Sequence, residues 1–125
     1  MDLREIRSRD RPPIEAYGNG GFRIGGAFHA GSLLLLPRGV AAWNPMRVED
    51  ITGESLEAVR AVADDIDFVL IGTGRSMRPL PAPARDSLVA VGLGVEFMDT
   101  GAACRTYNVL VAEERRVAAA LIAVE

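Results

Sequence analysis

Lysine is absent from this chain, and all 14 of its basic residues are arginine. Chemistry that depends on a lysine is therefore excluded: Schiff-base formation, a lysine general base, and the lysine of a P-loop. Arginine stays charged and offers a rigid fork of donors to carboxylates and phosphates. We expect the basic residues to bind and orient groups, not to react with them.

Cysteine and histidine are almost absent, with one of each: Cys104 and His29. No internal disulfide can form, which suits a reducing compartment. One cysteine and one histidine do not make a zinc site, so no metal, cofactor or catalytic residue is predicted. One hypothesis is a thiol enzyme. Its nucleophile would be the thiolate of Cys104, favoured by a position near the start of a helix and paired with His29. Its alternative is a small buried side chain.

Long hydrophobic runs are also missing. The longest apolar stretch, residues 117–124, is too short to span a bilayer. The first thirteen residues lack the apolar core of a secretory signal, and their acidic residues argue against a mitochondrial presequence. With a net charge of −3, no general nucleic-acid surface is expected. These features predict a cytoplasmic protein without membrane insertion.

What is present fits one globular domain of 125 residues. Residues 1–13 are charged and predict a mobile N-terminal arm, followed by a single domain over residues 14–125. Residues 17–43 consist of short apolar runs separated by glycines, a pattern typical of strands joined by tight turns. Leu33 to Leu36 predict a strand covered on both faces, ended by Pro37.

From residue 50 the pattern alternates between helix and strand. We expect helices over 55–66, from Pro83 to Gly92 or Gly94, and after a Thr100 cap, with strands at 68–71, 95–98 and 117–123. The side chains expected to face inward are Leu56, Val59, Ala63, Ile66, Ala84, Leu88, Val91, Ala103, Tyr107, Leu110 and Val111. The predicted fold is α/β and three-layered, a mixed central sheet with helices and an additional N-terminal β layer.

Two segments follow strands whose carboxyl ends would meet at one sheet edge: Gly72-Thr73-Gly74 and Asp99-Thr100-Gly101. The first is not a dinucleotide fingerprint, because Met77 stands where the third glycine belongs and prolines prevent a helix from starting there. It is either a tight structural turn or a polar pocket in which glycine amides and Arg75 bind an anion.

The third helix adds a polar pair, Arg105 and Asn108, which share one face. This face is either a binding surface or a solvated surface with a local hydrogen bond. The full set of candidate ligand-binding or partner-binding residues is Gly72, Thr73, Gly74, Arg75, Thr100, Arg105, Tyr107 and Asn108.

Three segments, "IGTG" (71–74), "GVEFMDTGAACRTYNVL" (94–110) and "EERRVAAALIAV" (113–124), resemble a family of small proteins of unknown function. That family includes the mitochondrial NADH dehydrogenase 1 alpha subcomplex assembly factor 3 and the adipogenesis-associated domain protein. The resemblance runs from Phe22 to Ala123. It implies a three-layer fold and, for the mitochondrial branch, assembly of respiratory complex I through protein contacts.

The resemblance implies no enzyme activity, cofactor or catalytic set. It marks most of the candidate residues above as shared motif positions. Where the family has Glu-Gly-Arg after the third helix, this chain has Glu114-Arg115-Arg116, which should alter the end of that helix.

Two functional hypotheses follow. The first is a non-enzymatic protein-interaction or assembly factor, linked by resemblance to complex I, whose exposed face includes the Gly72–Arg75 loop and the Arg105/Asn108 pair. The alternative is a small-molecule binding protein, for an anion or metabolite, or a cryptic enzyme with a pocket at the strand ends. Proteins are the expected partners, and the sequence leaves self-association open.

Overall fold

The computed structural model describes residues 11–125. Residues 1–10 of the predicted arm lie outside this part. Arg11, the first described residue, is attached to the body of the protein, because its guanidinium donates a hydrogen bond of 3.1 Å to the carbonyl of Arg115. The described strands form a three-stranded sheet in the order β1-β2-β3 and a five-stranded sheet in the order β5-β4-β8-β6-β7.

The smaller sheet is an antiparallel meander of β1 (Ile14–Gly18), β2 (Gly21–Ile24) and β3 (Ala27–Ala30). Its first turn is Asn19-Gly20, and both residues have positive φ, 55° and 79°. Two such residues match the right-handed twist of the flanking strands, and Asn-Gly is the favoured pair for them. The prediction that glycines punctuate an N-terminal β layer is confirmed.

The larger sheet contains β4 (Ser32–Leu36), β5 (Gly39–Trp43), β6 (Phe68–Gly72), β7 (Gly94–Met98) and β8 (Val117–Leu121). Strand β6 runs parallel to β7 and β8, whereas β4 runs antiparallel to β5 and β8. The sheet is therefore mixed, as predicted. Strand β4 is buried from its first residue through Leu35, and it ends before Pro37.

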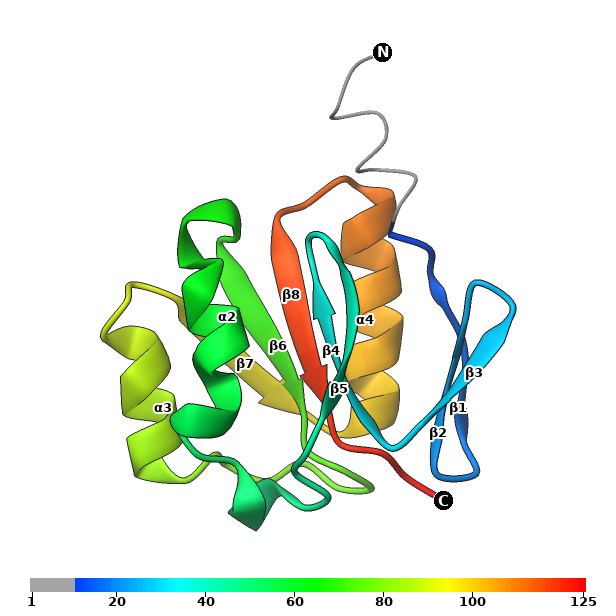
Figure 1. Ribbon diagram of the computed structural model, residues 1–125, viewed down its shortest axis with the longest axis horizontal. Coiled ribbons are helices and arrows are strands. Elements are labelled where there is room, and N and C mark those ends of the chain that lie inside the picture. The colour runs from blue at the N-terminus through cyan, green and yellow to red at the C-terminus, as the bar shows by residue number, and fades with distance from the viewer. Residues whose placement is uncertain (1–10) are drawn as a thin grey trace.

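The helices are α2 (Glu57–Ala61), α3 (Ala82–Val89) and α4 (Thr100–Ala112), with short 3-10 turns η1 (Val48–Asp50), η2 (Glu54–Leu56) and η3 (Ala63–Asp65). Helices α2 and α3 lie on one side of the larger sheet, and α4 lies on the other, next to β1–β3 (Figure 1). This arrangement confirms the predicted α/β fold with an additional N-terminal β layer.

The larger sheet separates two hydrophobic cores. In β6, Val69 and Ile71 pack into the core beneath α2 and α3, while Leu70 packs into the core beneath α4. Because neighbouring residues of a strand point to opposite faces, an uninterrupted apolar run is what a strand covered on both sides requires.

The helix predicted over 55–66 is interrupted. Helix α2 covers only Glu57–Ala61, and a 3-10 turn follows it. Asp64 and Asp65, which are poor helix formers, occupy that turn. The second predicted helix also ends earlier than expected, at Val89, so Val91 is 44% exposed instead of inward-facing.

Both ends of α4 differ from expectation. Asp99, not Thr100, is the N-cap, and its carboxylate accepts a 2.8 Å hydrogen bond from the amide of Ala102. At the other end Glu114 has φ +58°. The amides of Glu114 and Arg115 bond back to the carbonyls of Val111 and Leu110 at 2.9 Å each. This is a Schellman ending, and its left-handed residue is Glu114 in place of the usual glycine.

Candidate functional site

The carboxyl ends of three parallel strands meet at one edge of the larger sheet. Gly72, the last residue of β6, is in register with Met98 of β7 and with Leu121 of β8. The segments that leave these strands, beginning at Thr73, Asp99 and Ile122, therefore start side by side. The two loops predicted to meet there do so.

The hydroxyl of Thr100 joins these segments. It accepts a 2.9 Å hydrogen bond from the amide of Gly74 and donates one of 2.7 Å to the carbonyl of Ile122. The amide of Thr100 in turn donates to the carbonyl of Gly74 at 2.8 Å. The side chain is fully buried, so the start of α4 is attached to both neighbouring strand ends without water.

Two glycines are needed for this close contact. A Cβ on Gly72 would lie 3.0 Å from Leu121 Cδ2 and 3.1 Å from the Cα of Thr100, so its neighbours would have to move by a few tenths of an ångström to admit it. Gly74 has φ +107°, a conformation that side chains disfavour. The Gly-Thr-Gly sequence is therefore explained by packing, as the structural-turn interpretation holds.

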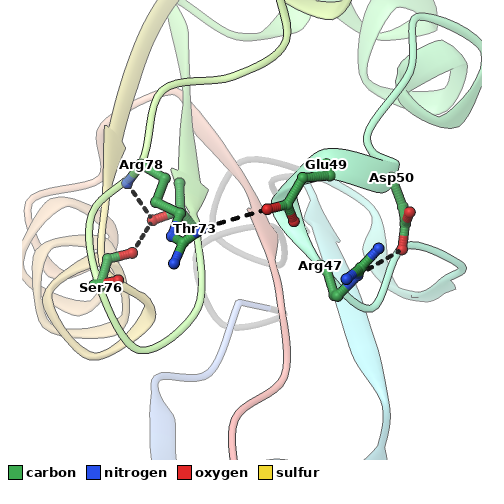
Figure 2. A network of polar contacts seen from close by, with 6 residues as sticks. All are labelled: Arg47, Glu49, Asp50, Thr73, Ser76 and Arg78. Atoms are coloured by element: carbon green, nitrogen blue, oxygen red, sulfur yellow. Dashed lines mark hydrogen bonds and ion pairs between the residues drawn. The ribbon is translucent and has the colours of Figure 1, made fainter.

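The loop that follows is closed by Thr73. Its hydroxyl donates 2.7 Å to the carbonyl of Ser76 and accepts 3.1 Å from the amide of Arg78 (Figure 2). Thr73 itself is buried, whereas Arg75, Ser76 and Arg78 are exposed. The loop thus presents its arginines to solvent from a fixed base.

A cleft of about 450 Å³ opens beside this loop. Three segments line it: residues 46–49 after β5, residues 73–76 with Arg78 after β6, and residues 122–125 after β8. Ligand sites in mixed and parallel sheets form at this position, outside the carboxyl ends of the strands.

Two of the three arginines in the cleft are paired with carboxylates. Arg78 lies 3.3 Å from Glu49, and Arg47 lies 3.8 Å from Asp50 (Figure 2). Arg75 makes no hydrogen bond or ion pair with any residue among 11–125. Its guanidinium is the cationic group in the cleft that is left to bind something else.

Arg75 also borders a second hollow, of about 420 Å³, on the side of α4. This hollow is lined by Tyr17, Asp99 and Gly101 and shares Gly74, Arg75, Val124 and Glu125 with the cleft. Arg75 therefore lies on the boundary between the two, where a molecule occupying either of them would meet its guanidinium.

Two methionines add apolar surface here. Met46 lines the cleft and is 58% exposed, and Met77, between Ser76 and Arg78, is 59% exposed. Arginine and methionine are both enriched in protein interfaces, and the flexible thioether adapts to different partners. The region around Arg75 thus combines exposed cationic and apolar side chains.

Thr100 and Tyr107 are buried and do not form part of the cleft surface. Thr100 has no exposed surface, and Tyr107 is 2% exposed and packs in the core beneath α4. Burial raises the pKa of Tyr107, an effect that the nearby Arg11 opposes. The expectation that these two side chains contact a ligand or partner is corrected: they stabilise the strand ends and the core.

The side chains of Asn108 and Arg105, predicted to form one polar face, lie in different environments. The side-chain Oδ1 of Asn108 accepts a 2.7 Å hydrogen bond from the backbone N–H of Ile14, and its Nδ2 donates a 2.9 Å bond to the carbonyl of Ile14. Asn108 thus joins α4 to β1 across 94 residues and is half-buried. Arg105 is exposed and lines neither hollow.

The thiol hypothesis is contradicted. Cys104 is 3% exposed, and burial raises the pKa of its thiol to about 12, with Arg105 lowering it and Asp99 raising it by smaller amounts. We expected the start of the helix to favour the thiolate, but desolvation in the core outweighs that effect.

Among residues 11–125, no cluster of three or more histidine, cysteine or acidic side chains could hold a metal ion. No helix in the same part of the chain is long and apolar enough to cross a membrane.

Several lining residues were missed from the sequence: Met46, Arg47, Glu49, Val124 and Glu125. Residues 46–49 follow an antiparallel strand, so the rule about parallel strand ends does not include them. The strand order, which places β8 between β4 and β6, brings these segments together.

Comparison with known proteins assigns the chain to a family. A family profile described as "Protein of unknown function (DUF498/DUF598)" matches residues 14–122. The Xenopus tropicalis protein named NADH dehydrogenase [ubiquinone] 1 alpha subcomplex assembly factor 3 is 36% identical over 109 residues, 87% of this chain and 60% of that protein. The chain thus spans about three fifths of this relative's length.

Two solved structures have the same architecture. The crystal structure titled as an outer membrane protein from Bartonella henselae has a TM-score of 0.87 and 43% identity, covering 92% of this chain and 97% of that one. A Mth938-like domain from Bordetella pertussis has a TM-score of 0.77 and 31% identity, covering 93% and 89%. The fold, the ordered motifs and the profile match agree: this chain belongs to the DUF498/DUF598 family.

Proposed function

We propose that this protein is a non-enzymatic assembly factor that binds a protein partner with the cleft around Arg75. The proposed partner is a subunit of respiratory complex I that is being assembled. The observation that carries the proposal is the Arg75 guanidinium, which has no partner among residues 11–125. It lies between two hollows on a loop with a fixed base, and two exposed methionines lie near it in the chain and in the cleft. Relatives named as complex I assembly factors supply the choice of pathway.

A recognition role suits the chemistry of the cleft. Its polar side chains are arginines, carboxylates and hydroxyls, and two of the arginines are neutralised by Glu49 and Asp50. The thiol of Cys104, the nucleophile considered from the sequence, is enclosed in the core. Arginine is one of the residue types that most often dominate the binding energy of an interface, and Arg75 has no partner within the described part of the chain.

The test replaces Arg75 by alanine in the organism that encodes the protein, after its own gene has been deleted. We expect the deletion to reduce assembled complex I, measured as NADH:ubiquinone oxidoreductase activity and by native gel electrophoresis. Arg75→Ala should fail to restore assembly, and recovery of complex I subunits with the tagged protein should fall about tenfold, as for an interface residue of this kind.

Arg85→Ala is the matched control. Arg85 is exposed on α3 and lines neither hollow, so this variant should restore assembly fully. Normal complex I in the deletion strain, or restoration by Arg75→Ala, would contradict the proposal.

A further inference from the structure

Strand β5 forms one edge of the larger sheet and is the edge strand with the fewest protective features. The two sheets have four edge strands among the described residues: β1, β3, β5 and β7. Residues 39–43 of β5, Gly-Val-Ala-Ala-Trp, include no charged residue, no proline and no irregularity of register. Proteins usually protect such edges, because unpaired backbone groups attract another strand.

The other edges are protected. Strand β1 contains Glu15 and an irregular register at that residue. Strand β7 contains the exposed Glu96 at its centre. Strand β3 has four residues, contains His29 and lies between glycine turns. A charge, a bulge and a short length are the known protective devices. Strand β5 has no charge and no bulge, and it is one residue longer than β3.

Among residues 11–125, nothing bonds to the outer edge of β5. In an antiparallel pair, every second residue directs its N–H and C=O away from the neighbouring strand. The backbone of residues 39–43 bonds to no described residue outside the sheet. Val40 and Ala42 are exposed on the same face of the strand, and both side chains are small and apolar. At the start of the strand, Arg11 and Pro12 line a small pocket together with Gly39 and Val40.

We propose that β5 pairs with β5 of a second copy of this chain, antiparallel about a twofold axis, and joins two five-stranded sheets into one. A second copy fits because it supplies the same uncharged strand at its own surface, so Val40 of each copy can meet Ala42 of the other around a central Ala41. A twofold axis matches each backbone donor with an acceptor and closes the assembly at two copies. The contact is small, so the dissociation constant is expected near 0.1 mM, roughly that of a weak transient contact.

Sedimentation equilibrium tests this directly, with samples from about 10 μM to about 1 mM spanning the expected constant. The wild type should move from the monomer mass of 13.4 kDa towards twice that value. Ala42→Lys, which places a charge on the exposed face of β5, should remain monomeric over the same range. The amides of residues 39–43 should also exchange more slowly at high concentration in the wild type only.

Ala30→Lys is the matched control, because Ala30 is an exposed alanine on the edge strand β3. It should associate like the wild type, and circular dichroism should show that both variants are folded. A wild type that stays monomeric at the highest concentration, or an Ala42→Lys variant that associates like it, would overturn the proposal. Neither result would bear on the Arg75 cleft.

Discussion

At the scale of single residues, Thr100 is the side chain on which the geometry of the site depends. Its hydroxyl bonds to both Gly74 and Ile122 and has no contact with water. Removing a buried hydroxyl leaves its partners without a hydrogen bond, and this is more costly than the bonds themselves are favourable. A residue predicted to bind a partner therefore acts one step earlier, by holding the loop that carries Arg75.

We expect Thr100→Val, which keeps the shape of the side chain, to lower the free energy of unfolding by about 2–3 kcal/mol. Thr106→Val, on the same helix, is the control, because that hydroxyl donates only a 3.6 Å bond to the sulfur of Met98. It should lower the free energy of unfolding by less than about 1 kcal/mol. Urea denaturation measures both, and equal losses would show that the Thr100 hydroxyl has no special role.

At the scale of elements, the end of α4 is strained by its sequence. The left-handed position of a Schellman ending favours glycine, and this chain has Glu114 there. A side chain in this conformation costs roughly 1–2 kcal/mol. The family resemblance drew attention to Arg115 as the unusual residue, but the structure places the strain one residue earlier.

The prediction compares two substitutions at position 114. Both remove the glutamate side chain together with its contacts, and only glycine relieves the backbone. We expect Glu114→Gly to be more stable than Glu114→Ala by about 1 kcal/mol, the reverse of their order inside a helix. Thermal unfolding followed by circular dichroism would show it, and an alanine variant at least as stable as the glycine variant would contradict the backbone argument.

At the scale of the whole molecule, the absence of lysine simplifies the dependence of the free energy of unfolding on pH under alkaline conditions. Between pH 9 and pH 11 the usual titrating side chains are lysine, cysteine and tyrosine, and this chain has no lysine, one cysteine and two tyrosines. Burial raises the pKa of Cys104 from 9.0 to about 12. The unfolded chain therefore loses the thiol proton first, so the contribution of this thiol to stability is fully present below pH 9 and is lost as the pH rises towards 12.

We expect the free energy of unfolding of the wild type to decrease between pH 9 and pH 11, and that of Cys104→Ala to decrease less over the same interval. Urea denaturation at several pH values gives both curves. The raised pKa of Tyr107 adds a common slope above about pH 10, which cancels in the comparison. Parallel curves would mean that the thiol is accessible to water in the folded state.

The sequence predicted more of the fold than of the candidate site. The alternation of apolar runs predicted the order of strands and helices from β4 to β8. A strand buried on both faces is a continuous apolar run, and such a run can be recognised without knowing which strands lie beside it. Helix ends were less accurate: Asp99 and Thr100 can both cap, and only the backbone conformation shows that Asp99 does. Of the candidate residues, Thr73, Gly74 and Arg75 line the cleft, whereas Arg105, Tyr107 and Asn108 do not.

Local properties of the chain determined that the protein is α/β, that it has no lysine for chemistry, and that Gly72-Thr73-Gly74 lacks the spacing of a dinucleotide fingerprint. Tertiary structure decided which polar groups are exposed. Thr100 and Arg75 lie in similar short motifs, yet one is enclosed by two strand ends and the other has two hollows beside it. Exposure depends on segments far apart in the chain, and no local pattern of residues reports which distant segment will cover a side chain.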